Sequence, residues 1–230
     1  MARQLTYAER TLHSRNPLTR YAHRSRYRIS LAMANRLLPQ GGRIVDFGAG
    51  DGTFLARLHE MRPDARLTAV EPRMHIGHDF IERLGALGDC APGSAELVTA
   101  FETLEHVSDD EVTQFLDDAE AALAPEGRLL VTVPIMYGAA LPLKELSKTL
   151  LYRRRGDTGA LELLRGTFGL PIARTPTRLE SHKGFDFRPL KRLIDAQLPL
   201  LETGYSPLAA LPWWLNSQAI FVARKSAGAR

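Results

Sequence analysis

The stretch that decides the fold is Val45-Asp46-Phe47-Gly48-Ala49-Gly50-Asp51-Gly52. Residues 43–47 are a short apolar run rich in β-branched and aromatic side chains, and residues 53–61 have helical spacing, so the glycines lie where a strand turns into a helix. Glycines at such a turn allow positive φ and a close approach of the backbone to a ligand. The stretch therefore predicts a ligand-binding loop.

The spacing of these glycines excludes the dinucleotide fingerprint. That fingerprint would place its third glycine at position 53, which is Thr53. The loop instead has glycines at every second position, and Asp46 precedes the first of them by two residues. A carboxylate there would repel a pyrophosphate but suits a ligand that carries an ammonium group.

Strand and helix patterns alternate on both sides of the loop. This alternation predicts an α/β fold, a parallel sheet with helices on both faces. Ser108 or Asp109 is expected to cap one helix, with Glu111 in its first turn. The expected helices are 18–38, 53–61, 74–84, 109–123 and 190–198, and the expected strands are 43–47, 66–70, 96–101, 129–134, 200–203 and 219–223.

Two further carboxylates follow strands of this pattern. Glu71 ends the second strand, where a doubly wound sheet would place it beside the glycine loop and let it accept both hydroxyls of a ribose. Asp89 lies where a third strand would end and could contact an adenine amino group.

Together, the loop and Glu71 resemble the class I S-adenosylmethionine (SAM)-dependent methyltransferases, as do residues 98–107 and 123–134. The resemblance covers about residues 40–136 and, more weakly, 190–224. It implies a Rossmann-like sheet of seven strands whose last strand is antiparallel, with SAM bound across the ends of the first four strands. The residues that it implies for SAM binding are Asp46, Gly48, Ala49, Gly50, Gly52, Glu71, Asp89 and Phe101.

A Glu-x-x-Glu-His segment, Glu102 to His106, follows the fourth strand, where the resemblance places the methyl acceptor. It is similar to the corresponding segment of metal-dependent O-methyltransferases, including the ubiquinone-pathway and small-RNA enzymes. In the small-RNA group a distal histidine completes the site, and here His182 is the histidine that follows His106. Glu102, Glu105, His106 and His182 are thus candidate ligands of Mg²⁺ or Mn²⁺.

A metal-free alternative stays open at this segment. His106 could instead be the catalytic base, with Glu105 beside it, or the segment could serve packing alone. The sequence does not decide among these readings.

Charge is unevenly distributed along the chain. Residues 1–43 hold nine arginines and one glutamate, residues 44–136 have a net charge of −12, and residues 137–192 have a net charge of +7. The basic segments are either solvated surface or a cover that receives an anionic acceptor or an acidic membrane. Residues 141–152 are amphipathic and precede Arg153–Arg155, which suits contact with a membrane surface or a lid packed on its own domain.

The 230 residues, 44% of them hydrophobic, fit a single domain. Its expected parts are an N-terminal helical cover (1–40), a SAM-binding core (41–136), a lid inserted after the fifth strand (137–189) and a C-terminal helix with strands (190–230). One cysteine, Cys90, excludes an internal disulfide framework. The absence of a long apolar run or a signal core predicts a cytoplasmic protein, with peripheral contact at the inner membrane face as an expectation.

The sequence thus predicts a methyltransferase that acts on a hydroxyl of a small-molecule, glycan or lipid-linked acceptor. An RNA methyltransferase is an alternative, but no RNA-binding module or aromatic stacking platform is evident, so nucleic acid is an unexpected partner. A non-catalytic SAM-binding regulator or partner subunit is the other alternative.

Overall fold

A computed structural model describes residues 17–139, 141–142, 145–146, 158–174 and 182–225 of the protein, with the backbone alone for residues 17–23. Helix α2 (Pro17–Leu37) leads into β1 (Arg43–Phe47), α3 (Thr53–Met61), β2 (Arg66–Val70) and β3 (Ile81–Leu84). Then follow β4 (Ala95–Phe101), the short 3₁₀ helix η2 (Leu104–His106), α4 (Asp109–Ala122) and β5 (Leu123–Pro134). The chain continues through α6 (Ala160–Thr167), α7 (Phe187–Gln197), β6 (Leu200–Ser206), η3 (Trp213–Leu215) and β7 (Gln218–Arg224).

The strands form one seven-stranded sheet in the order β3-β2-β1-β4-β5-β7-β6. Strands β1 to β5 pair in parallel, and β7 is antiparallel to both β5 and β6. This confirms the predicted sheet and its antiparallel last strand. The chain order reverses between β1 and β4, and ligands bind at such a switch point, beyond the carboxyl ends of the strands.

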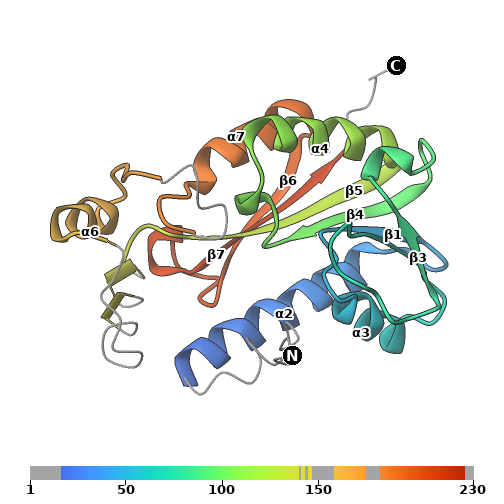
Figure 1. Ribbon diagram of the computed structural model, residues 1–230, viewed down its shortest axis with the longest axis horizontal. Coiled ribbons are helices and arrows are strands. Elements are labelled where there is room, and N and C mark those ends of the chain that lie inside the picture. The colour runs from blue at the N-terminus through green and yellow to red at the C-terminus, as the bar shows by residue number, and fades with distance from the viewer. Residues whose placement is uncertain (1–16, 140, 143–144, 147–157, 175–181, 226–230) are drawn as a thin grey trace.

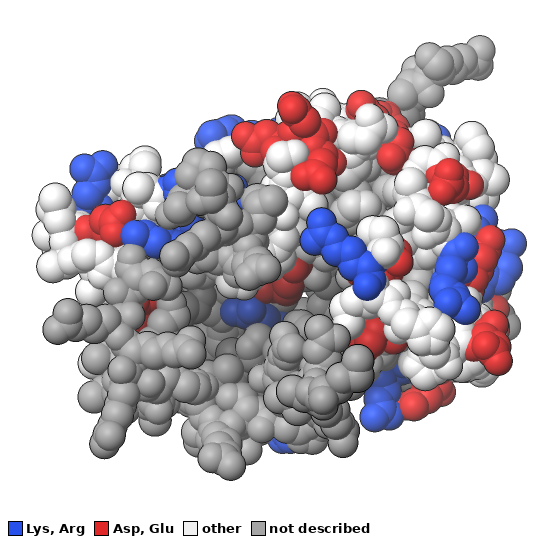
Figure 2. Space-filling model, viewed as in Figure 1, with Lys and Arg blue, Asp and Glu red and all other residues white. Residues whose placement is uncertain are grey.

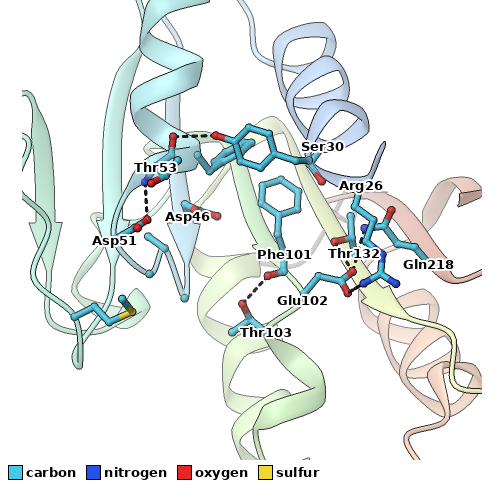
Figure 3. Close-up of a pocket in the computed structure, with 16 residues that line it drawn as sticks. Arg26, Ser30, Asp46, Asp51, Thr53, Phe101, Glu102, Thr103, Thr132 and Gln218 are labelled. Carbon is cyan, nitrogen blue, oxygen red and sulfur yellow. Dashed lines mark hydrogen bonds and ion pairs between the residues drawn. The ribbon is translucent and has the colours of Figure 1, made fainter. Parts of the chain in front are cut away.

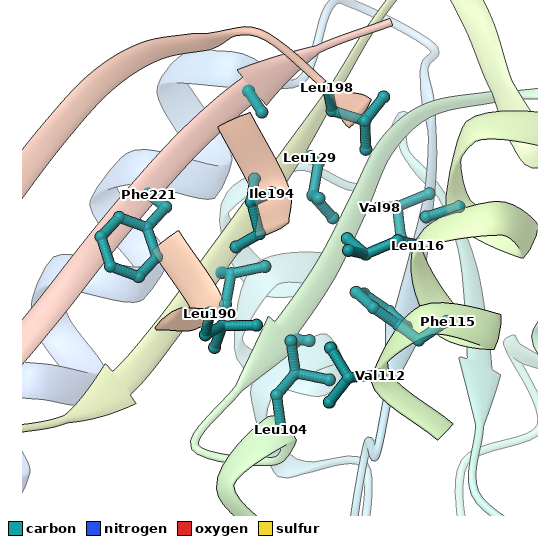
Figure 4. Close-up of a cluster of buried hydrophobic side chains, with 14 of the residues drawn as sticks. Val98, Leu104, Val112, Phe115, Leu116, Leu129, Leu190, Ile194, Leu198 and Phe221 are labelled. Carbon is teal, nitrogen blue, oxygen red and sulfur yellow. The ribbon is translucent and has the colours of Figure 1, made fainter. Parts of the chain in front are cut away.

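Helices cover both faces of the sheet, as predicted (Figure 1). Helices α4 and α7 lie on one face, and α2 and α3 lie on the other. On the first face Val112, Phe115 and Leu116 of α4 and Leu190 and Ile194 of α7 are buried against sheet residues such as Val98 and Leu129 (Figure 4). On the second face Leu55 and Leu58 of α3 meet Ala34 and Leu37 of α2 in a separate core.

The predicted helix over residues 74–84 is wrong. The chain instead forms an irregular connection followed by strand β3, which pairs with β2 from Ile81 to Leu84. Ile76 and Ile81 are buried and pack with the α3 side of the sheet, so tertiary burial and a strand partner outweigh the weak helical spacing. Gly77 also lowers the helical propensity of the segment.

The other boundaries differ by smaller amounts. Helix α4 ends at Ala122, and β5 begins at Leu123, six residues before the expected strand, with an irregular register against β4. Helix α7 begins at Phe187 because the Asp186 carboxylate accepts the Arg188 N–H and caps it. Of the two expected caps, Ser108 is the one that caps α4, in a capping box with Glu111 of the first turn.

Of the expected lid, residues 137–189, the structure describes α6 and short flanking segments. Arg153–Arg155 and most of the amphipathic stretch 141–152 lie outside the described residues. Among the helices that the structure describes, none has the length and hydropathy needed to span a lipid bilayer.

Candidate functional site

A pocket opens at the carboxyl ends of β1 and β4, and α2 forms one of its walls (Figure 3). The loop after β1 contributes one side, the segment after β4 the opposite side, and the ends of β5 and β7 the floor. The lining residues are Arg26, Tyr27, Ser30, Asp46, Gly48, Ala49, Gly50, Asp51, Thr53, Phe54, Met74, Phe101, Glu102, Thr103, Thr132 and Gln218. The pocket therefore lies at the topological switch point.

The glycines of the loop have the backbone conformation that their sequence predicts. Gly48, Gly50 and Gly52 have φ values of 74°, 58° and 78°. A Cβ on Gly48 would lie 2.5 Å from Cγ2 of Thr103, so the loop packs tightly against the segment after β4. A Cβ on Gly50 would meet only the Met74 sulfur, at 3.9 Å, which leaves open space where a ligand can approach the backbone.

Asp46 provides a buried carboxyl group in the wall of this pocket. It accepts a hydrogen bond of 2.6 Å from the Thr99 hydroxyl. Burial is the main reason that the pKa of Asp46 is raised to about 7; the Thr99 hydrogen bond opposes this rise, and the charge of Glu71 adds to it. An ammonium group at this place would restore the ionised form, so Asp46 fits a ligand that carries one.

Glu71 holds the loop in place from the end of β2. Its carboxylate accepts the backbone N–H groups of Gly50, Arg73 and Met74 at 3.1, 2.8 and 3.2 Å. It stands behind Gly50 and is not among the residues that line the pocket. The structure therefore gives Glu71 a supporting role in the loop, and its expected contact with a ribose stays a prediction.

The other expected cofactor residues divide into two groups. Ala49 and Phe101 line the pocket, and Gly52 is the N-cap residue of α3 and is not among the lining residues. Asp89 lies in a 3₁₀ turn after β3, where its carboxylate accepts the Ala86 N–H at 2.8 Å, and it is absent from the pocket lining.

Glu102 forms a polar network across the floor of the pocket. Its carboxylate binds the Arg26 guanidinium at 2.9 Å and accepts hydrogen bonds from Gln218 at 3.0 Å and Thr132 at 3.3 Å (Figure 3). Glu102 also has a positive φ of 50°, which is strained for a residue with a side chain. The network joins α2 to the ends of β4, β5 and β7.

Sequence reasoning missed two members of this network. Gln218 begins β7 and Thr132 lies near the end of β5, both inside apolar strands. A polar side chain within an otherwise apolar strand was the signal that could have identified them, since such groups are buried only with a partner. Arg26 was expected only as part of the basic N-terminal segment.

Glu105, His106 and His182 come together beside this network. Glu105 has no exposed surface, and its Oε1 lies 3.7 Å from His106 Nε2 and 3.5 Å from His182 Nδ1. The two imidazole rings lie 4.7 Å apart between centroids. The expected metal ligand Glu102 is not part of this cluster, because its carboxylate is directed to Arg26 and Gln218. The structure thus assembles three of the four predicted ligands.

The Glu105 carboxylate is unusual because neither oxygen accepts a hydrogen bond within the described residues. Burial raises the pKa of Glu105 well above its ordinary value, and the charge of Glu102 raises it further. A buried carboxylate costs free energy unless it is paired, protonated or bound to a metal. The cluster can therefore hold a proton shared with an imidazole, or a divalent cation.

Comparison with known proteins supports the same fold. A chain from Burkholderia thailandensis, 1,6-didemethyltoxoflavin-N1-methyltransferase with bound S-adenosylhomocysteine, is 16% identical, with a TM-score of 0.56 over 88% of this chain and 79% of that one. PH0226 from Pyrococcus horikoshii is 14% identical, with a TM-score of 0.56 over 96% of both chains. A complex of Haloferax volcanii that contains the methyltransferase activator Trm112 includes a chain that is 15% identical, with a TM-score of 0.57 over 97% of this chain and 96% of that one.

No curated protein sequence matches the chain. The family model described as "Methyltransferase domain" matches residues 21–165. That match covers more than half of the chain and includes the glycine loop, Glu71 and the segment from Glu102 to His106. Together with the strand order and the buried carboxylate of the pocket, it shows that the chain belongs to the methyltransferase-domain family of class I SAM-dependent methyltransferases.

Proposed function

We propose that the enzyme transfers the methyl group of SAM to a hydroxyl oxygen of a small-molecule, glycan or lipid-linked acceptor. The observation that carries this proposal is the Glu105, His106 and His182 cluster, which adjoins the pocket wall formed by Glu102 and Thr103. A hydroxyl must lose its proton on attack, and an imidazole beside a buried carboxylate is suited to receive it.

The pocket residues bind and orient the donor. Asp46 fits its ammonium group, and the open backbone at Gly50 lets the chain approach closely. Phe54 packs edge-on against Phe101, with 4.6 Å between the ring centroids, and Tyr27 packs edge-on against Phe54, with 6.5 Å between the centroids. These three rings form an aromatic wall that excludes water. SAM supplies an already activated methyl group, so these residues contribute mainly by orienting the donor and excluding water from it.

His106 is the proposed base for the acceptor proton. Its Nε2 faces the Glu105 carboxylate, whose negative charge stabilises the imidazolium formed when the proton arrives. The separation of 3.7 Å is longer than a hydrogen bond, as catalytic contacts often are before substrate binds. His182 approaches the same oxygen from another segment and can relay the proton away.

A divalent ion at the same three side chains is the second part of the proposal. The distances from the Glu105 oxygen to the two imidazole nitrogens are longer than a hydrogen bond. They are near the distance between neighbouring ligand atoms on one ion, which is roughly 3 Å or slightly more. Such an ion supplies Lewis acidity that lowers the pKa of a bound hydroxyl. Without Glu102, the donor set has two imidazoles and one carboxylate, which favours Mn²⁺, Fe²⁺ or Zn²⁺ over Mg²⁺.

The methyl transfer is tested by incubating purified protein with methyl-labelled SAM and fractionated cell extract, followed by mass spectrometry of labelled products. We expect the label on an oxygen atom and no labelled product with Asp46→Ala. A label on nitrogen or carbon would contradict the choice of a hydroxyl, and SAM binding without any product would favour the non-catalytic alternative.

Metal binding is tested separately from activity. After chelation and dialysis, titration calorimetry with Mn²⁺ should show one site in the wild-type protein and none in His182→Ala. Glu111→Ala is a matched control, since Glu111 is an exposed carboxylate that only caps α4. Equal Mn²⁺ binding by wild type and His182→Ala would exclude the ion and leave His106 as the base.

A further inference from the structure

The cluster of Glu105, His106 and His182 is assembled from two segments that lie outside the strands of the sheet. Glu105 and His106 belong to η2, whereas His182 comes from the segment before α7. The pairing of strands therefore does not fix the distance between the two segments. Yet Glu105 Oε1 lies only 3.5 Å from His182 Nδ1, so other contacts must set this distance.

The segment that carries His182 packs against the stretch of chain that follows α6. Gly184 has a φ of 74°, and a Cβ there would lie 2.8 Å from the Ala173 carbonyl oxygen. The buried Tyr137 hydroxyl donates to the Gly184 carbonyl and accepts the Ile172 N–H, each at 3.4 Å. The two stretches therefore form one packed unit.

Arg174 extends from this unit to η2. Its Nη2 donates to the backbone carbonyl of Glu105 at 2.8 Å. The same guanidinium lies over the ring of Phe185, 5.4 Å from its centroid, and the Phe185 N–H donates to the His182 carbonyl at 3.2 Å. Arg174 thus contacts both halves of the cluster, the backbone of η2 and the turn that begins at His182.

The surrounding charge favours a cation at this position. Acidic side chains gather over α4, which follows η2 in the chain (Figure 2). Asp109, in the first turn of α4, lines the same cavity as Arg174. Burial raises the pKa of Glu105, and the charge of Arg174 is among those that oppose this rise. A neutral side chain of the same length would not have this electrostatic stabilisation.

We propose that Arg174 is a positioning residue of the acceptor side: it ties η2 to the turn that begins at His182 and so holds both imidazoles beside the Glu105 carboxylate. This inference rests on the proposed function, because Arg174 acts only through the cluster. It assigns Arg174 no contact with the donor or the acceptor. Reacting groups need such support, since a small displacement of a catalytic group can cost a large part of the rate.

The first test is nuclear magnetic resonance of the full-length protein with labelled histidine, without any acceptor. The His106 and His182 rings, whose centroids are 4.7 Å apart, should give a nuclear Overhauser effect (NOE) in the wild type. The variants His106→Gln and His182→Gln assign the signals. We expect Arg174→Met to lose this NOE and Arg174→Lys to keep it, because an ammonium group can also donate to a carbonyl.

Arg165→Met is the matched control. Arg165 lies on α6 and also donates to a backbone carbonyl, that of Pro171 at 3.3 Å. This variant should keep the NOE between the two histidine rings. The proposal is overturned if Arg174→Met keeps the NOE, if Arg165→Met also loses it, or if Arg174→Lys behaves like Arg174→Met.

The second test uses the acceptor that the labelling experiment identifies. Arg174→Met should lower kcat about tenfold or more, because the base is displaced, and should leave the Kd for SAM unchanged. An unchanged kcat would also overturn the proposal. Absence of any oxygen-methylated product would instead refute the proposed function, whereas the NOE is measured without an acceptor and tests Arg174 by itself.

Discussion

The pocket proposed for the donor and the cluster proposed for the acceptor, called the donor pocket and the acceptor cluster here, are built in different ways. One continuous stretch of the chain forms the core of the donor pocket. Asp46 lies in β1, and the glycines of the loop that follows have positive φ. The acceptor cluster joins Glu105 and His106, after β4, to His182, which precedes α7. A local motif can place a ligand, whereas the proposed reacting groups need a fold that brings distant segments together.

The largest expected effect breaks the donor pocket alone. Gly48→Ala should weaken SAM binding about 100-fold, because a Cβ there has a strained φ and clashes with Thr103. Gly41→Ala is the control, since Gly41 also has positive φ but its Cβ would meet nothing within 4 Å. Calorimetry should find SAM affinity unchanged in the control, and an equal loss in both variants would contradict the assignment of the loop.

The next effect concerns the charge of Asp46. The pKa of Asp46 is raised to about 7 in the folded protein, so below pH 7 its carboxyl group is protonated. A ligand ammonium group that pairs with the carboxylate must then release this proton. SAM affinity should therefore rise with pH by up to about tenfold per unit below pH 7 and level off above it. Titrations from pH 5.5 to 8.5 measure this dependence.

Asp46→Asn should bind SAM more weakly at pH 8 and lose the pH dependence. Without ligand, the free energy of unfolding changes with pH in the opposite direction. The unfolded chain loses the Asp46 proton at lower pH than the folded protein does, so the folded protein becomes less stable as the pH rises towards about 7. Asp51→Asn, at another carboxylate of the pocket lining, should keep the pH dependence of SAM affinity. If that variant abolishes it instead, Asp46 is not the titrating group.

A smaller effect is expected at the acceptor cluster. Burial raises the pKa of Glu105, so its ionised form destabilises the fold at neutral pH. In protein from which metal has been removed with a chelator, Glu105→Gln should therefore increase the free energy of unfolding by about 1 kcal/mol. In thermal unfolding, Mn²⁺ should then raise the Tm of the wild type but not of Glu105→Gln. A Tm that Mn²⁺ raises equally in both would contradict metal binding at Glu105.

The same contrast explains how far the sequence could be read. The glycine loop, the Ser108 cap and the strand alternation are local patterns, and the structure has them where they were expected. The predicted helix over residues 74–84 failed because burial of Ile76 and pairing with β2 are tertiary effects. The pairing of Glu102 was also missed, since its partners Arg26 and Gln218 lie on α2 and β7, far away in the sequence.

Glu102 lies between the two regions, and the smallest expected effect tests whether it connects them. Arg26→Met removes an ion pair whose side chains are only 16% and 17% exposed, and leaves the strained Glu102 with neutral donors from Thr132 and Gln218. We expect a loss of about 1 kcal/mol in the free energy of unfolding, because the remaining charge loses its paired cation. Urea denaturation measures this loss.

Arg36→Met provides the comparison on the same helix. Arg36 pairs with Glu202 at 2.6 Å, but both side chains are about half exposed, so its removal should cost less than about 0.5 kcal/mol. Arg26→Met should also weaken SAM binding about threefold, since α2 carries Tyr27 and Ser30 in the pocket wall and loses its anchor there. If both variants cost the same and neither changes SAM affinity, the Glu102 network holds α2 no better than a surface pair, and the donor pocket and the acceptor cluster act independently.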